Sequence, residues 1–188
     1  TASVLGIDDA TIAAGLAAAE PVPGRFERVA EAEAAALGIA VVVDYAHTPD
    51  GLHEVIAAAR GVADGRVVLV FGCGGDRDHT KRPAMGAVAA SEADVAVVTS
   101  DNPRSEPPLA IIDAVLRGMS PEQRDQVIVE PDRAAAIAAA VQVAEPGDIV
   151  VIAGKGHETT QTIGRETVAF DDRVVVRDVL LAAAGGAS

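Results

Sequence analysis

The sequence predicts an α/β fold in which a Rossmann-like, mainly parallel sheet is flanked by helices and followed by a C-terminal hairpin. From Asp44 onward, short runs rich in Val and Ile alternate with stretches of helical periodicity, which is typical of repeated strand–helix units around a parallel sheet. A helix-start signal or a glycine-rich turn follows each apolar run. Near the end, Gly164-Arg165-Glu166 separates two short β-type runs, which indicates the hairpin.

The expected strands are short, apolar and bounded by polar residues or glycine; they cover residues 40–43, 66–71, 94–99, 126–129 and 149–153. Three helices between them have clear start signals. Thr48 and Pro49 open the first. Ser105 is expected to cap the second, which Gly118 ends, and Asp132 to cap the third.

The two ends of the chain depart from this alternation. Residues 1–23 carry one expected helix, at 8–19, and a proline-rich linker, so we interpret them as the end of one domain and residues 24–188 as another. At the other end, we expect hairpin strands at 160–163 and 167–170 and a closing helix at 173–184. Because the chain begins at Thr1 without Met or a signal peptide, we expect a fragment or a processed product.

The composition of the chain excludes several classes of function. The 188 residues fit one ordinary domain, and their formal charge of -13 argues against binding to nucleic acid or to an anionic membrane. No apolar run approaches the about 18 residues of a membrane span, so we expect a soluble protein. The single cysteine, Cys73, excludes an internal disulfide and fits a reducing compartment such as the cytoplasm.

Asp101-Asn102-Pro103-Arg104 follows one of the apolar runs, so these polar groups are expected at the carboxyl end of a buried strand, where α/β sheets bind ligands. Arg104 can hold a carboxylate in a two-bond fork, while Asp101 and Asn102 can accept hydrogen bonds from an ammonium group. The tetrapeptide therefore suits a small zwitterion. The alternative is an Asx-Pro turn that leaves Arg104 in solvent.

Two glycine-rich segments follow other strands. In residues 72–78, glycines allow a close approach of the backbone to a ligand, and Arg77 is expected at the same sheet edge as Arg104. This segment fails the dinucleotide-binding pattern, and residues 154–158 fail the phosphate-loop pattern. The second segment could be a tight turn, or a ligand edge that supplies Gly154, Lys155 and Glu158.

The first expected strand ends in Asp44-Tyr45-Ala46-His47-Thr48-Pro49. Asp44 is placed like the acidic residue that accepts ribose hydroxyls in nucleotide-binding α/β domains. His47 could instead cap the helix or fill space. The four histidines are isolated from one another and from other ligands, so no metal site is expected, and Cys73 is interpreted as a buried spectator thiol.

Five segments, in this order and spacing, resemble the Mur ligases, and the resemblance runs from about Val22 to the C-terminus. The segments are residues 23–27, 44–52, 72–83, 101–104 and 154–158. The resemblance implies three domains: one that holds a UDP-sugar, a central ATPase, and a Rossmann-like C-terminal domain that binds an amino acid. Residues 24–188 resemble the last, and residues 1–23 resemble the final helix of the central one.

The resemblance also implies roles for single residues. It assigns ATP contacts to Arg25, Asp44 and His47. It assigns amino-acid contacts to Arg77, Asp101, Asn102, Arg104, Gly154 and Glu158. Asp-Asn-Pro-Arg is typical of the members that take meso-diaminopimelate, with Arg77 on its α-carboxylate. One departure is the acidic stretch 31–38, longer than the family leads us to expect between Arg25 and Asp44.

The reaction implied is an ATP-dependent ligation of meso-diaminopimelate to UDP-MurNAc-L-Ala-D-Glu in peptidoglycan biosynthesis. Mg²⁺, its ligands and the catalytic machinery are expected on the remaining domains, so no catalytic or metal-binding residue is assigned in this chain. Two alternatives stay open: a related amide ligase similar to folylpolyglutamate synthase, and a non-catalytic module that binds an amino acid.

Overall fold

A computed structural model describes residues 3–19 and 21–185 of the chain. Its main sheet has six strands in the order β1-β2-β6-β3-β4-β5, and all neighbours are parallel except β1, which is antiparallel to β2. The strands are β1 Glu27–Arg28, β2 Ala40–Asp44, β3 Val67–Cys73, β4 Val95–Ser100, β5 Ile128–Val129 and β6 Ile149–Ala153. The predicted fold class is confirmed.

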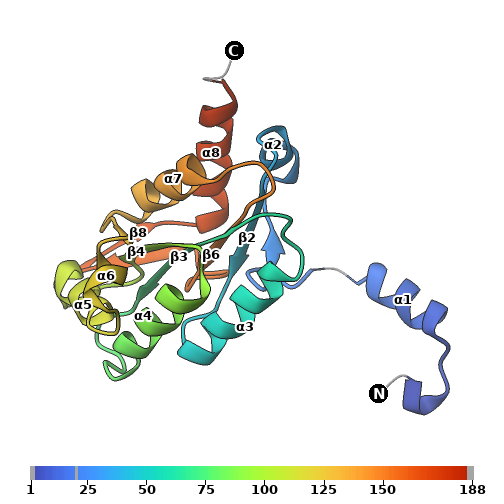
Figure 1. The fold of residues 1–188 in the computed structure, drawn as a ribbon, viewed down its shortest axis with the longest axis horizontal. Coiled ribbons are helices and arrows are strands. Elements are labelled where there is room, and N and C mark those ends of the chain that lie inside the picture. The colour runs from blue at the N-terminus through green and yellow to red at the C-terminus, as the bar shows by residue number, and fades with distance from the viewer. Residues whose placement is uncertain (1–2, 20, 186–188) are drawn as a thin grey trace.

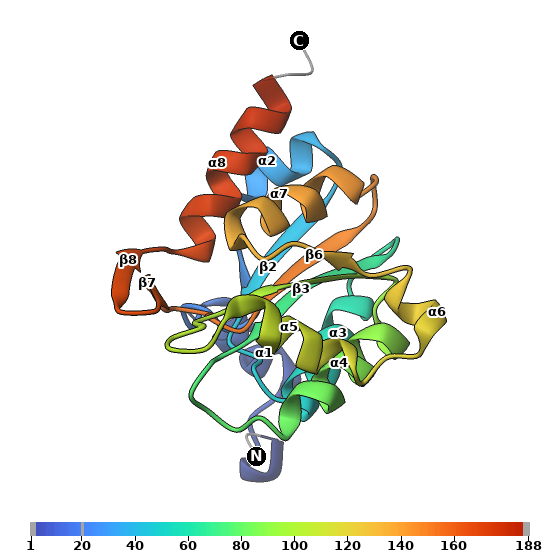
Figure 2. The same ribbon diagram turned by 90° about the vertical axis from the view of Figure 1, so that its left-hand side faces the viewer.

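Helices cover both faces of this sheet (Figures 1 and 2). One face packs against α3 Pro49–Arg60, α4 Lys81–Glu92 and α5 Pro108–Leu116. The other packs against α2 Glu31–Ala36, α7 Arg133–Val143 and α8 Asp172–Gly185. Strand residues alternate between the two cores: Leu69 and Phe71 face the first, Val68 and Val70 the second.

A hairpin and three short helical segments lie outside these layers. The predicted hairpin forms a separate two-stranded sheet, β7 Thr160–Ile163 and β8 Glu166–Ala169, which is joined to the rest by a bridge between Arg104 and Ile163. A short helix, α6 Pro121–Arg124, precedes β5. The helix α1 Asp9–Ala17, with a 3-10 turn at Ser3–Leu5, stands apart from the sheet (Figure 1).

Two of the three helix starts agree with prediction. The side-chain oxygen of Thr48 accepts a hydrogen bond from the backbone N–H of Gly51, and Asp132 accepts one from Ala135. The cap assigned to Ser105 is wrong, because α5 begins after Pro107 without a side-chain cap. Ser105 instead donates its hydroxyl to Asp76, 2.6 Å away in the glycine-rich loop.

Other differences concern short or alanine-rich elements. Helices α2, α4 and α6 and strand β1 were not predicted as such, and the acidic stretch that departs from the family forms α2. The hairpin turn is shorter than expected, since Glu166 already belongs to β8. Within the described ranges, none of the helices combines the length and apolar character of a membrane span. Thr1, where the chain begins, lies outside those ranges.

Candidate amino-acid and nucleotide sites

A cavity of about 320 Å³ lies at the carboxyl edge of the sheet, between the loops that follow β2, β3, β4 and β6. It is lined by Tyr45, His47, Gly74, Arg77, Asp78, Lys81, Asp101, Asn102, Arg104, Gly154 and Glu158. All six residues that the resemblance assigns to the amino acid are in this set. The guanidinium groups of Arg77 and Arg104 therefore share one cavity, although 27 positions of sequence separate them (104 − 77).

Arg104 is held at this cavity by its backbone and its side chain. It has a left-handed φ of 52°, its N–H donates to the carbonyl of Thr162, and its Nη1 donates to the carbonyl of Gly75 at 2.7 Å. A Cβ at Gly74 would lie 2.9 Å from that Nη1, so a glycine permits the approach. Since a guanidinium has five N–H donors, others remain for a ligand. These contacts exclude the alternative of a turn with Arg104 in solvent.

Asn102 and Glu158 form the opposite part of the wall. Asn102 donates from Nδ2 to Glu158 Oε2 at 2.8 Å, and its Oδ1 accepts from the backbone N–H of Thr162 at 3.0 Å. Both ends of the amide are thus engaged, which fixes its orientation. Lys155, fully buried, lies behind this pair and donates to Glu158 at 3.3 Å and to the carbonyl of Thr160 at 2.5 Å.

Gly154 brings the end of β6 against Asp101. Its φ is +118°, and a Cβ there would lie 2.7 Å from the Oδ2 of Asp101. Only glycine accepts both the backbone angle and the close approach. Asp101 itself is 8% exposed, and its backbone carbonyl accepts a hydrogen bond from Gln161 at 2.8 Å. The residues 154–158 are therefore a built edge of the cavity and not only a turn.

The glycine-rich loop after β3 packs directly on the Asp101–Arg104 loop. A Cβ at Gly75 would lie 1.8 Å from the carbonyl oxygen of Pro103, and Gly75 donates its N–H to Asn102 O at 2.9 Å. Glu106 accepts a two-bond fork from the buried Arg82, with N–O distances of 2.8 and 2.9 Å. The hydrogen bond from Arg82 and one from the backbone of Asp76 lower the pKa of Glu106 to about 2.

Two cations at the cavity have little of their charge compensated by nearby contacts. Arg77 is exposed, and its Nη1 lies 3.4 Å from the carbonyl of the neighbouring Asp76. Lys81, at the start of α4, donates from Nζ to the carbonyl of His47 at 2.6 Å. Neither contact is with a carboxylate, so both positive charges can act on an anion in the cavity.

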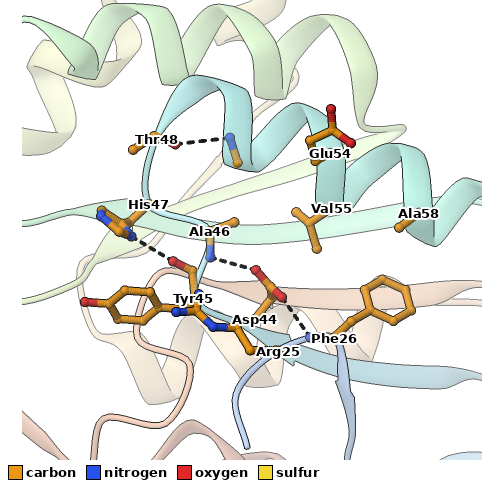
Figure 3. A pocket seen from close by; sticks show the side chains of 11 residues that line it. Arg25, Phe26, Asp44, Tyr45, Ala46, His47, Thr48, Glu54, Val55 and Ala58 are labelled. Carbon is orange, nitrogen blue, oxygen red and sulfur yellow. Dashed lines mark hydrogen bonds between the residues drawn. The ribbon is translucent and has the colours of Figure 1, made fainter. Parts of the chain in front are cut away.

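A second cavity, of about 480 Å³, adjoins the first, because Tyr45 and His47 line both (Figure 3). Its wall contains the residues that the resemblance assigns to ATP, Arg25, Asp44 and His47. Arg25 lies flat over the ring of Tyr45, with its Cζ 4.5 Å from the ring centroid. His47 packs edge-on against the same ring, and its Nδ1 is 2.8 Å from the backbone carbonyl of Tyr45.

Asp44 is more constrained than the sequence indicates. Its Oδ2 accepts the N–H of Phe26 and its Oδ1 the N–H of Ala46, both at 2.7 Å. The carboxylate therefore joins the entry segment of the domain to the loop after β2, and one lone pair on each oxygen remains for a ligand.

Tyr45 and Lys81 line the cavity, although sequence reasoning assigned them no ligand contact. Lys155, which the sequence offered as a cation of a possible ligand edge, is instead fully buried. Lys155 lies inside a recognised motif, but its burial depends on the hairpin, which no local pattern reports. Burial raises the pKa of the Cys73 thiol to about 12, as befits a spectator. In residues 3–19 and 21–185, no cluster of three or more His, Cys, Asp and Glu side chains is arranged to hold a metal ion.

Comparison with known proteins identifies the family of this chain. The pattern of the family described as "Mur ligase, glutamate ligase domain" matches residues 24–156. The chain is 53% identical, over 177 residues, to the UDP-N-acetylmuramoyl-L-alanyl-D-glutamate--2,6-diaminopimelate ligase of Solibacter usitatus. That match covers 93% of this chain and 34% of the relative. With the enzyme of the same name from Parasynechococcus marenigrum it shares 60% identity over 154 residues, 81% of this chain and 30% of the relative.

Solved structures of Mur ligases and folylpolyglutamate synthases also match the chain. A diaminopimelate ligase of the same name matches with a TM-score of 0.80 at 37% identity, over 96% of this chain and 38% of that one. The folylpolyglutamate synthase/dihydrofolate synthase of Yersinia pestis, complexed with AMPPNP and Mn, matches at 0.56 and 22% identity, over 94% of this chain and 34% of that one, and so shares the fold. The chain spans about a third of the length of the curated relatives it matches. It belongs to the Mur ligase family.

Proposed function

We propose that residues 24–188 are the C-terminal, amino-acid-binding domain of an ATP-dependent ligase that adds meso-diaminopimelate to UDP-MurNAc-L-Ala-D-Glu in the cytoplasm, a step of peptidoglycan biosynthesis. Residues 1–23 are then the last helix of the central ATPase domain and its linker. The observation that carries the proposal is the shared cavity, in which six residues from three separate segments meet.

The charges of the cavity suit this amino acid. Three cations line it, Arg77, Lys81 and Arg104, and three anions, Asp78, Asp101 and Glu158. The lining is therefore formally neutral (3 − 3 = 0) and of mixed sign, like meso-diaminopimelate with its two carboxylates and two ammonium groups. Lysine has one carboxylate fewer and a net positive charge, so it matches the cavity less well.

The groups of the ligand have natural partners. Arg77 takes the α-carboxylate, and Arg104 with the second N–H of Asn102 takes the distal carboxylate. The distal ammonium lies at the carbonyl of Gly154 and at Glu158, whose Oε1 is not engaged by Asn102 or Lys155. Asp101 completes this acidic side. The amine that reacts then faces the open mouth of the cavity.

ATP contacts lie at the second cavity. Arg25 leaves the ring of Tyr45 and reaches the phosphates when the domains close, Asp44 uses its free lone pairs for ribose hydroxyls, and His47 lines the nucleotide edge. Mg²⁺ accompanies ATP, with its ligands on the remaining domains. Since the sequence carries no phosphate loop, the 188-residue chain alone should hydrolyse no ATP.

In the reaction, ATP phosphorylates the D-glutamyl side-chain carboxylate of the UDP-linked substrate. The amine of meso-diaminopimelate then attacks the acyl phosphate, an amide forms, and phosphate leaves. This chain contributes positioning: it holds the amine at the activated carbonyl and so lowers the entropic barrier to the attack.

The test is ligation by the full-length enzyme that contains this chain. Phosphate release should require both UDP-MurNAc-L-Ala-D-Glu and meso-diaminopimelate, and lysine or glutamate should replace the latter poorly. Turnover with glutamate and a folate would favour the folylpolyglutamate alternative. Binding of meso-diaminopimelate without any turnover would favour the non-catalytic module.

A further inference from the structure

A fully buried ion pair lies behind the amino-acid cavity. Arg133, the first residue of α7, donates from Nε and Nη2 to the two carboxylate oxygens of Asp172, the first residue of α8, at 2.7 Å each. Both side chains are 0% exposed. Burial opposes the charge on Arg133, but the carboxylate of Asp172 outweighs it and raises the pKa of the guanidinium. Arg133 therefore keeps its positive charge at every physiological pH.

The same guanidinium bonds the ends of two strands. Its Nη1 lies 3.3 Å from the carbonyl oxygen of Ser100, and its Nη2 lies 3.0 Å from that of Ala153. Ser100 is the last residue of β4 and Ala153 the last of β6. The next residues are Asp101 and Gly154, which pack against each other in the wall of the cavity.

These two strands are not neighbours, because β3 runs between them. Strand β3 pairs with β6 only as far as Val70 and Ile152, whereas it stays paired with β4 up to Cys73 and Ser100. The ladder between β3 and β6 thus ends before the two strands reach the cavity, although β6 stays paired with β2. Beyond that point the ladder no longer sets the distance from β6 to β4, and Arg133 connects the two ends directly.

We propose that Arg133, held by Asp172, is a positioning residue for the amino-acid cavity: one guanidinium sets the separation of the strand ends that carry Asp101 and Gly154. This inference rests on the proposed function, since it assumes that the cavity holds the amino acid. Arg133 does not touch the ligand. It acts through two backbone carbonyls, so its loss should affect amino-acid binding and leave ATP binding alone.

The matched experiment compares Asp172→Asn with Asp148→Asn in the full-length enzyme. Asp148 makes a similar pair with Arg66 at the opposite end of β6, with N–O distances of 2.8 and 3.0 Å, and is 3% exposed. Both variants lose stability. Asp172→Asn should in addition raise the KM for meso-diaminopimelate by about tenfold or more, the loss that follows a small misplacement of binding groups. The KM for ATP should not change, and Asp148→Asn should change neither.

A second variant tests the positioning role without leaving an unpaired charge that could cause misfolding. Arg133→Met with Asp172→Leu removes both charges and fills the space with apolar atoms, an exchange that often preserves stability. It should show the same selective rise in the KM for meso-diaminopimelate. An equal rise in both KM values, no rise, or failure of this double variant to fold would overturn the positioning role. A wild-type enzyme that does not use meso-diaminopimelate would instead refute the proposed function.

Discussion

The two cavities meet at Tyr45 and His47, yet they are built in different ways. In the amino-acid cavity, Arg104, Asn102 and Glu158 are each held by hydrogen bonds from another loop. In the adjoining cavity, the exposed guanidinium of Arg25 stacks on the ring of Tyr45, and among the described residues it has no hydrogen-bond or ion-pair partner. The part of the first cavity that Arg104, Asn102 and Glu158 form is organised before any ligand arrives. The second has a cation that can leave its place at small energetic cost, as the proposed contact of Arg25 with ATP on domain closure requires.

The largest effect should follow from Arg104→Ala, which removes the proposed partner of the distal carboxylate. Loss of a desolvated ionic partner costs about 2 to 5 kcal/mol, so the preference for meso-diaminopimelate over lysine should fall by roughly 1.5 to 3.5 decades. The measurement is the ratio of kcat/KM for the two amino acids in the full-length enzyme. Arg177→Ala, on the exposed side of α8, is the control. An unchanged ratio would remove Arg104 from the site.

Gly75→Ala should break the organised cavity without removing any charge. The new methyl would meet the carbonyl of Pro103, so the two loops must separate. We expect a loss of about 1 to 3 kcal/mol in the free energy of unfolding together with a raised KM for meso-diaminopimelate. Gly61→Ala is the matched control, because its nearest neighbour would be 3.4 Å away. Wild-type stability of Gly75→Ala would show that the loops are not packed as described.

Arg25→Ala tests the loosely held side. An exposed cation–π contact is worth about 0.5 to 1 kcal/mol, so the free energy of unfolding should change little. If Arg25 reaches the phosphates of ATP, loss of a charged hydrogen bond should raise the KM for ATP about tenfold. The KM for meso-diaminopimelate should stay as it is. A change confined to the KM for meso-diaminopimelate would show that Arg25 belongs to the amino-acid site instead of the ATP site.

The smallest effect concerns acid stability. Because the pKa of Glu106 falls from an ordinary 4.5 to about 2 on folding, its contribution is present above pH 4.5 and is lost as the pH drops towards 2. Glu106 is partly exposed, so solvent screens part of this contribution. Glu106→Gln should flatten the pH dependence of the free energy of unfolding in that window, measured by denaturant titration. A variant that keeps the wild-type slope would show that Arg82 does not perturb this carboxyl.

Local patterns predicted the parts of the molecule that depend on local chemistry. The apolar runs of β2, β3, β4 and β6 and the caps at Thr48 and Asp132 agree with the structure because periodicity and capping act within a few residues. Ser105 had the same local signature as those caps. It failed because α5 begins only after Pro107 and because Ser105 donates both its N–H and its hydroxyl to Asp76, 29 positions away.

The site could be predicted only in part for a related reason. Polar residues that end parallel strands come together at one edge, so Arg77, Asp101 and Arg104 could be placed in one region in advance. Arg133 could not, since its partners are two backbone carbonyls and a residue 39 positions away. No spacing in the sequence reports such contacts. The resemblance supplied Gly154 and Glu158 where composition left their role undecided.

Gly24, where the matched family segment begins, packs against the backbone of Gly156 and His157 so closely that an added Cβ would lie 2.2 Å from the nitrogen of His157. The incoming polypeptide therefore crosses the Gly154–Glu158 segment backbone to backbone, with no side chain between them. In the proposed full-length enzyme, a movement of the preceding domain would act on the chain at this crossing. The crossing lies next to Glu158, which lines the amino-acid cavity, so such a movement would reach the edge of that cavity through the backbone.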